Sequence, residues 1–211
     1  MASRKMGREM AEKLTDRKRR SVVEAAVKEF QRRGFDNTSM DQIAATAGVS
    51  KRTVYNHFAG KEDLFAVIIE RIAELADVIP EFEFESKKSA ESQLRAIGDN
   101  IFAAIGEPEF QDLARVVLSR LINAPHASGA LEETTNAITM QVTQWFADAK
   151  NAGMLNVPRP KVASSQFIGM LMEYEFWPRL IGVTKQVHQV SPKTYVRDCA
   201  RVIVNAYAPK P

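Results

Sequence analysis

The sequence predicts an all-α protein of about nine helices, a small three-helix unit followed by a larger helical bundle. Apolar residues recur at the three- and four-residue spacing of amphipathic helices along most of the 211 residues. Glycine and proline stand between these periodic stretches, where helices begin and end. Residues 79–88 lack a helical stripe and are predicted to be a loop, and no stretch is predicted to be a strand.

The N-terminal residues 1–15 are predicted to be a flexible basic arm, because they are polar and carry no apolar stripe. Two interpretations stay open for this arm. It is either a solvated tail, or a segment that adds contacts to phosphates or to a minor groove. From about Asp16 to Arg33 the pattern is that of an amphipathic helix, which Gly34 is expected to end.

The stretch Thr38–Lys61 is predicted to hold two short helices joined by a tight turn. The segment Ser39–Gln42 has the spacing of a capping box. Gly48 stands where a helix ends in a left-handed residue, since glycine has no Cβ to clash there. Ser50 is then a good N-cap for the second helix, residues 51–58. Together with the preceding helix, these elements are expected to form a three-helix domain.

The helix over residues 51–58 has two chemically different faces. Val54 and Phe58 are four residues apart and are expected to point into the core. The other face carries groups that hydrogen-bond phosphate oxygens and base edges in a major groove. A solvated polar face is the plain alternative, but the capped helix and the turn glycine before it favour helix-turn-helix DNA binding within residues 16–60. The outward residues are Lys51, Arg52, Tyr55 and Asn56.

The stretch GFDNTSMDQIAATAGVSKRTVYNHFAGKEDLFAVI closely resembles the DNA-binding domain of the TetR/AcrR family of bacterial transcriptional regulators. The resemblance extends from about Arg17 to Leu75. It implies that Thr38 and Lys61 hold phosphates at the two ends of the motif and that Tyr55 holds another. The residues implied to contact DNA are Thr38, Ser50, Lys51, Arg52, Thr53, Tyr55, Asn56, His57 and Lys61. The resemblance further implies an all-helical homodimer with a larger C-terminal domain for a small effector.

A connecting helix is predicted over residues 61–79, before Pro80, and residues 80–211 are expected to form the C-terminal domain. Its position makes the connecting helix the mechanical link between the two domains. Helical spacing returns at residues 89–106, and Pro108 suits the first turn of the next helix, which breaks at Asn123. Three more helices are predicted at residues 131–150, 162–181 and 192–208.

The helix at 162–181 is apolar over more than one face, which a surface helix of a monomer should not be. It is either the central helix of the bundle or, with the helix at 192–208, part of a homodimer interface. A dimer suits DNA binding, because one short helix reads few bases and two-fold symmetry presents two helices to a palindrome.

Pro178 lies within this apolar region and is expected to end or kink the helix. A kink is a plausible wall for an effector pocket lined by apolar and aromatic residues. The alternative is that each candidate residue is ordinary core, and the existence of a pocket rests mainly on the resemblance. The candidate pocket residues are Phe102, Arg120, Trp145, Met170, Tyr174 and Trp177.

Composition excludes several classes of protein. Residues 1–62 hold 14 Lys and Arg against 8 Asp and Glu, and the rest of the chain holds 15 against 18, so the basic end coincides with the helix-turn-helix. No secretory signal or membrane span is predicted, and the single cysteine, Cys199, cannot form an intrachain disulfide, so a cytoplasmic protein is expected. The three histidines are scattered and no catalytic motif occurs, so we expect no enzyme, cofactor or metal site.

The sequence therefore favours a ligand-responsive transcriptional regulator, most simply a repressor that binds a palindromic operator as a homodimer and is released by a small, largely apolar effector. A second interpretation stays open, in which the C-terminal domain docks another protein and the chain has a chromosome-associated role.

Overall fold

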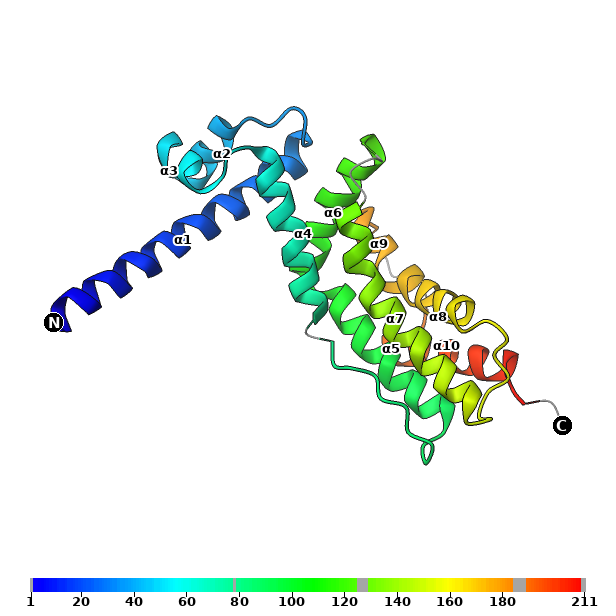
Figure 1. The fold of residues 1–211 in the computed structure, drawn as a ribbon. Coiled ribbons are helices and arrows are strands. Elements are labelled where there is room, and N and C mark those ends of the chain that lie inside the picture. The colour runs from blue at the N-terminus through cyan, green and yellow to red at the C-terminus, as the bar shows by residue number, and fades with distance from the viewer. Residues whose placement is uncertain (1, 78, 125–128, 184–188, 210–211) are drawn as a thin grey trace. The chain divides into compact units, whose positions relative to one another are not determined.

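The computed structural model describes residues 2–77, 79–124, 129–183 and 189–209, which form ten α-helices (Figure 1). No strand occurs among these residues, and the prediction of an all-α fold is confirmed. In chain order the helices are α1 (Ala2–Arg33), α2 (Met40–Ala47), α3 (Lys51–His57), α4 (Lys61–Asp77), α5 (Ala90–Gly106), α6 (Pro108–Asn123), α7 (Gly129–Asn151), α8 (Pro160–Glu175), α9 (Trp177–Leu180) and α10 (Pro192–Ala206).

The tenth helix arises from the break that Pro178 was predicted to cause. Helix α8 ends at Glu175, and the short α9 begins at Trp177. Proline lacks a backbone donor and its ring clashes with the carbonyl four residues earlier, so one long helix becomes two. Ser191 caps α10 and Pro192 opens it, also as predicted.

The first helix begins at Ala2, so the prediction of a helix from about Asp16 was wrong at its start. Residues 2–15 are rich in Ala, Glu, Lys, Arg and Met, which are strong helix formers, and this propensity continues the helix without an apolar stripe. A role of this arm in DNA contacts stays a prediction.

The chain forms two compact units, of which the first holds Met1–Arg71 and Leu113–Ala130 and the second holds Ile72–Asp112 and Leu131–Pro211. Helices α4 and α6 therefore each contribute residues to both units. The predicted division at residues 60 and 80 left the C-terminal part of α6 with the second domain, whereas the structure assigns it to the first unit.

The first unit has its core between α1, α2 and α3 (Figure 1). Val22 and Phe30 of α1, Ile43 of α2 and Val54 of α3 are at most 3% exposed. Each is an apolar position predicted from helical spacing, so burial of one stripe per helix accounts for the packing.

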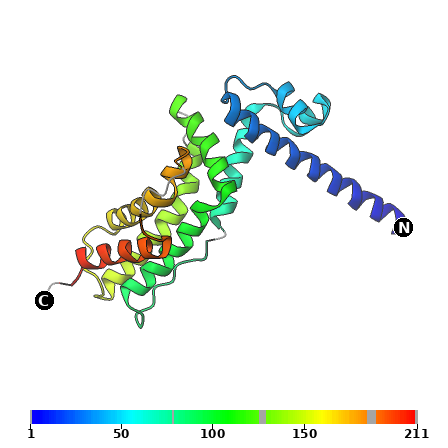
Figure 2. The same cartoon turned by 180° about the vertical axis from the view of Figure 1, so that it is seen from behind.

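The second unit has its core where α5, α8 and α10 meet, beside the long α7 (Figure 2). Gly98 of α5 allows the close approach, because a Cβ at this position would lie 2.7 Å from Cγ1 of Val196 and 3.2 Å from the ring of Phe167. The largest fully buried side chains of this core are Leu94, Ile101, Trp145, Phe146, Phe167 and Leu171.

The loop predicted at residues 79–88 is confirmed, and within the second unit it is held against α5 and α7. Gln93 of α5 donates to the carbonyls of Glu85 at 2.8 Å and Lys88 at 3.0 Å, while its Oε1 accepts from Trp145 at 3.1 Å. The Phe84 ring packs edge-on against Trp145. Among the described residues, no helix is both long and apolar enough to cross a bilayer.

Candidate nucleic-acid interface

The turn between α2 and α3 is built by the residues that the sequence singled out. Ser39 accepts from the Gln42 amide at 3.2 Å, and the Gln42 side chain accepts from the Ser39 amide at 2.8 Å, which completes the predicted capping box. Gly48 ends α2 with φ +66°, the left-handed region that glycine enters without strain. Ser50 then caps α3 by accepting from the Thr53 amide at 3.1 Å.

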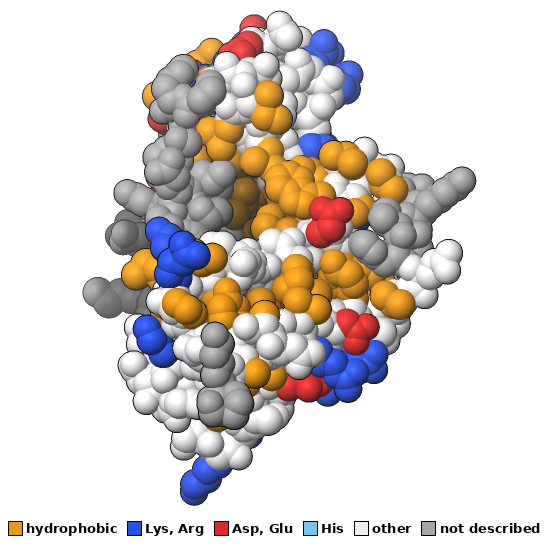
Figure 3. All heavy atoms as spheres, turned by 90° about the vertical axis from the view of Figure 1, so that its right-hand side faces the viewer, with side chains coloured by type: hydrophobic (Ala, Val, Ile, Leu, Met, Phe, Trp, Pro, Cys, Tyr) orange, Lys and Arg blue, Asp and Glu red, His pale blue; other side chains and the backbone are white. Residues whose placement is uncertain are grey.

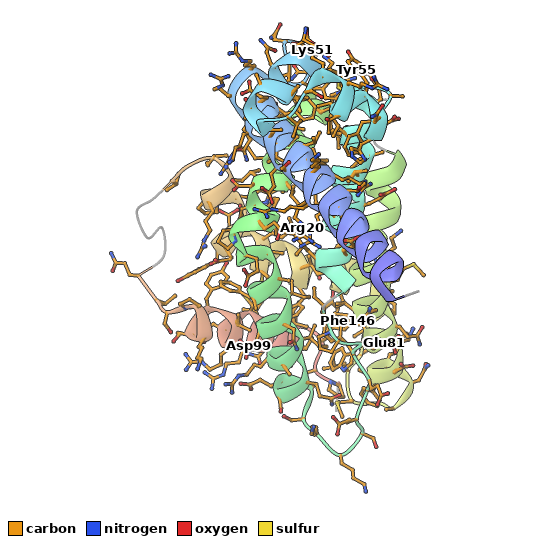
Figure 4. The ribbon with its side chains drawn as sticks, turned by 90° about the vertical axis from the view of Figure 1, so that its left-hand side faces the viewer. Arg20, Lys51, Tyr55, Glu81, Asp99 and Phe146 are labelled. Atoms are coloured by element: carbon orange, nitrogen blue, oxygen red, sulfur yellow. The ribbon has the colours of Figure 1, made fainter. Side chains whose placement is uncertain are left out.

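Helix α3 is anchored by one face and exposes the other. Val54 is fully buried and Phe58, just after the helix, is 3% exposed. Tyr55 is 54% exposed, and Figure 4 shows Lys51 and Tyr55 on the outer side of the helix. Ser50, Lys51, Arg52, Tyr55 and Asn56 are exposed, and Thr53 and His57 are half-buried. The outward set is the one predicted from the sequence.

Two groups of this face already have protein partners. The Lys51 ammonium pairs with the carboxylate of Asp41 in α2, and both side chains are largely exposed. The Thr53 hydroxyl lies 2.9 Å from the hydroxyl of Ser50. An exposed ion pair of this kind contributes little stability, so Lys51 can exchange Asp41 for a phosphate or a base edge at small cost.

Thr38, which the resemblance implied to hold a phosphate, has protein partners for its hydroxyl in the structure. It is 3% exposed, and its hydroxyl donates to the carbonyls of Gly34 at 2.8 Å and Glu29 at 3.2 Å. Thr38 thus closes the turn between α1 and α2. Its phosphate contact stays a prediction, one that requires the hydroxyl to leave these partners.

Lys61 lies at the start of α4 and reaches back to the same turn. Its ammonium donates to the carbonyls of Phe35 at 2.8 Å and Asp36 at 3.1 Å. An ammonium has three donors, so a further N–H can serve a phosphate without loss of these two bonds.

Glu29 was not among the predicted site residues, although it orders the three-helix domain. It is 3% exposed and accepts from Arg32 and Arg33 of α1 and, at 2.7 Å, from the hydroxyl of Thr46 in α2. The hydrogen bond from Arg32 is the main reason why the pKa of Glu29 falls to about 2, with a further contribution from Thr46. The signal in the sequence was a carboxylate on the apolar side of the helix, next to Phe30.

The candidate effector-pocket residues are only partly brought together. The Phe102 and Tyr174 rings lie 5.3 Å apart, and Tyr174 lies 4.6 Å from Tyr195, which donates to the carbonyl of Met170 at 3.0 Å. Phe102, Met170 and Tyr174 therefore share one cluster, and Tyr195 is a neighbour that the sequence reasoning missed.

The other three candidates lie elsewhere. Trp177 is 43% exposed beside Phe176, and Trp145 lines an open groove of about 370 Å³ between the 80–88 loop and α5. Figure 4 marks Glu81 on this loop. Arg120 belongs to the first unit, whereas the other five candidates belong to the second, and its place in an effector pocket stays a prediction.

Buried polar groups of the second unit are also relevant to a candidate effector site. The Oε1 atoms of Gln111 and Gln141 are buried without a hydrogen-bond partner among the described residues. Burial raises the pKa of Glu175, against the opposing effect of Arg179. Cys199 is buried as predicted, and desolvation raises the pKa of its thiol to about 11, so it is unreactive as a thiolate.

The helices predicted to form a dimer interface retain exposed apolar side chains. Figure 3 shows hydrophobic side chains gathered on the face of the second unit that carries α8 and α10. Val162 of α8 is 37% exposed and Val202 of α10 is 55% exposed. An apolar face of this kind is typical of an interaction surface.

Comparison with known families agrees with this geometry. Residues 22–68 match the family described as bacterial regulatory proteins, tetR family, and residues 92–209 match the C-terminal domain of AefR-like transcriptional repressors. The chain is 36% identical over 72 residues to the transcriptional repressor NicS of Pseudomonas putida, and 36% identical over 73 residues to the regulator AcrR of Shigella flexneri. These two alignments cover about a third of each relative's length, 33% and 32%.

A solved structure extends the similarity along the chain. A TetR family transcriptional regulator from Pseudomonas syringae pv. tomato is 33% identical, with a TM-score of 0.74, over 91% of this chain and 97% of the other. The two family matches and this likeness agree with the capped helix-turn-helix and the helical C-terminal unit. The chain belongs to the TetR family of bacterial transcriptional regulators, is a DNA-binding regulator rather than an enzyme, and carries a C-terminal domain of the AefR-like repressor type.

Proposed function

We propose that the protein is a homodimeric repressor that binds a palindromic operator through α3 and is released by a small, largely apolar effector. The observation that carries this proposal is the outward face of α3. Lys51, Arg52, Tyr55 and Asn56 are exposed together, while Val54 locks the helix to the core. Two cations with a phenol and an amide suit a major groove, where phosphates position the protein and base edges specify the sequence.

The palindrome and the dimer follow from the size of this helix. Helix α3 has seven residues, so a single copy contacts few base pairs. Two copies related by a two-fold axis read two half-sites about one helical turn apart, roughly 10 base pairs. The exposed apolar residues of α8 and α10 support an interface between two copies of the second unit.

The effector proposal is supported by the cluster of Phe102, Tyr174 and Tyr195 and by the buried free acceptor of Gln111. Aromatic walls with few polar groups are typical of sites for small apolar ligands. A buried amide oxygen without a partner is costly, and a ligand donor would satisfy it.

Selection from a random duplex library tests the DNA proposal. The purified protein is incubated with the library, bound duplexes are sequenced, and genomic footprinting locates the same motif. We expect an inverted repeat with half-sites about 10 base pairs apart, centre to centre. Enrichment of a single non-repeated site, or of no sequence, would contradict the proposal.

The effector proposal has its own test. Reciprocity requires a compound that releases the operator to bind more weakly when operator is present. Small aromatic and aliphatic compounds are screened for loss of operator binding, and each hit is titrated with and without operator. We expect Phe102→Ala to weaken the hit and to leave operator affinity unchanged. Compounds that bind equally well with and without operator would contradict the effector proposal. An absence of hits, together with protein partners that bind the C-terminal unit, would favour a docking role instead.

A further inference from the structure

Arg120 makes a contact between α6 and the turn that precedes α2, both within the first unit. Its guanidinium donates to the carboxylate of Asp36 at 2.7 Å and lies 3.9 Å from the centroid of the Phe35 ring. The Arg120 side chain is 18% exposed, although Asp36 is 71% exposed. A planar cation that stacks and pairs at once is held in one orientation, which an exposed ion pair alone would not achieve.

The same ring has a second cation beside it. The Lys61 ammonium lies 4.8 Å from the Phe35 centroid and donates to the carbonyls of Phe35 and Asp36. Residues 35 and 36 are thus held by the start of α4 through their backbone and by α6 through their side chains. We call these four residues, Phe35, Asp36, Lys61 and Arg120, the turn junction.

The turn junction is connected to the DNA-binding helices by a short stretch of backbone. Thr38 follows two residues after Asp36 and is buried with both its hydroxyl and its amide bonded inside the turn. Ser39 follows at once and caps α2. A shift of Phe35 and Asp36 must therefore move the start of α2, and the Gly48 turn passes that movement on to α3.

We propose that Arg120 is a positioning residue for operator binding, which sets the orientation of α2 and α3 through the turn junction without contact with DNA. The inference rests on the proposed function of α3. Helix α6 has its first residues in the second unit and Arg120 in the first. Besides the backbone connection through α4, α6 therefore has a non-covalent contact, made by the Arg120 side chain, with the turn that leads to α2 and α3.

The experiment compares Arg120→Ala and Arg120→Lys with Arg95→Ala, which removes one exposed arginine of α5 outside the turn junction. Dissociation constants are measured for the selected operator duplex and for a scrambled duplex of equal length, at several salt concentrations. Thermal unfolding and hydrodynamic size establish that each variant is folded and has the wild-type oligomeric state. Asp36→Ala and the double variant Asp36→Ala/Arg120→Ala complete a double-mutant cycle for this ion pair.

We expect Arg120→Ala to lose about tenfold in operator affinity, a coupling typical of residues in contact, with little change for the scrambled duplex. The operator affinity of Arg120→Lys should fall between those of wild type and Arg120→Ala, because an ammonium keeps the charge but lacks the planar fork that stacks on the ring and pairs with the carboxylate. The operator affinity of the double variant should be no lower than that of the weaker-binding single variant. If Arg120→Ala destabilises the fold, the intermediate affinity of Arg120→Lys supplies the same test.

Other results overturn the inference. Operator affinity of Arg120→Ala equal to that of Arg95→Ala would show that the contact is only structural. A salt slope reduced by about one for both duplexes would show that Arg120 itself binds a phosphate. If wild type and Arg95→Ala do not distinguish operator from scrambled duplex, the proposed function of α3 fails, and the inference falls with it.

Discussion

Glu29 of α1 accepts a hydrogen bond of 2.7 Å from the hydroxyl of Thr46, 17 residues later in α2. With Arg32 and Arg33 on its other side, this buried carboxylate connects the first helix to the helix-turn-helix. The arrangement predicts how the three-helix domain responds to substitution and to acid.

Glu29→Gln is expected to lower the free energy of unfolding by about 2 kcal/mol at neutral pH, because a neutral amide loses the charge-assisted bonds to two partly exposed arginines. Urea denaturation followed by circular dichroism measures the change. Glu24→Gln, an exposed glutamate of the same helix, is the control and should leave stability unchanged. Equal stability of both variants would mean that the Glu29 contacts contribute no net free energy.

The same residue predicts a pH dependence with a definite sign. The pKa of Glu29 is lowered in the folded state from 4.5 to about 2. A carboxylate with a depressed pKa stabilises the fold above its unfolded pKa, and this contribution is lost as the pH falls from about 4.5 towards 2. The stability difference between wild type and Glu29→Gln should therefore shrink across this interval. A difference that stays constant down to the lower end would contradict the assignment.

Tyr55→Phe is expected to weaken binding to operator and to unrelated duplex by a similar factor, roughly five- to tenfold, since a hydroxyl bonded to a phosphate carries no sequence information. Fluorescence anisotropy with both duplexes measures the change. Tyr207→Phe removes the same hydroxyl near the C-terminus, where it donates to Gln166, and should leave both affinities as they are. A loss confined to the operator would place Tyr55 against bases instead.

Gly98→Ala is expected to destabilise the second unit by about 2 kcal/mol, because the added methyl overlaps Val196 and packed cores resist such expansion. Gly169→Ala in α8 meets nothing within 4 Å and should stabilise the helix by about 0.5–1 kcal/mol. Thermal unfolding of both variants measures the contrast. Equal midpoints would show that α5 and α10 can separate without cost.

Val202→Glu tests the dimer helices. A carboxylate at an exposed apolar position of α10 should shift the protein towards monomer and weaken operator binding, because two half-sites are then no longer read together. Analytical ultracentrifugation measures the assembly. Ile122→Glu, at a 78% exposed position of α6, is the matched control and should remain dimeric. Dimers that persist in Val202→Glu would place the interface elsewhere.

The sequence predicted well what depends on local backbone chemistry. The capping box at Ser39, the left-handed Gly48 and the break at Pro178 each follow from neighbouring residues, and the outward face of α3 follows from its helical period. Contacts between distant residues were not accessible in this way. Arg120 and Asp36 are 84 residues apart, so neither spacing nor helical period in the sequence indicated that these two side chains pair.

The two tryptophans of the chain occupy opposite environments. Trp145 is 1% exposed with its indole nitrogen bonded to Gln93, whereas Trp177 is 43% exposed at the break after α8. Their intrinsic fluorescence should therefore separate into a blue-shifted component that iodide cannot quench and a red-shifted component that it can. Single-tryptophan versions of the protein thus carry built-in optical reporters, one for the interior beside the 80–88 loop and one for the surface at α9, without an attached dye.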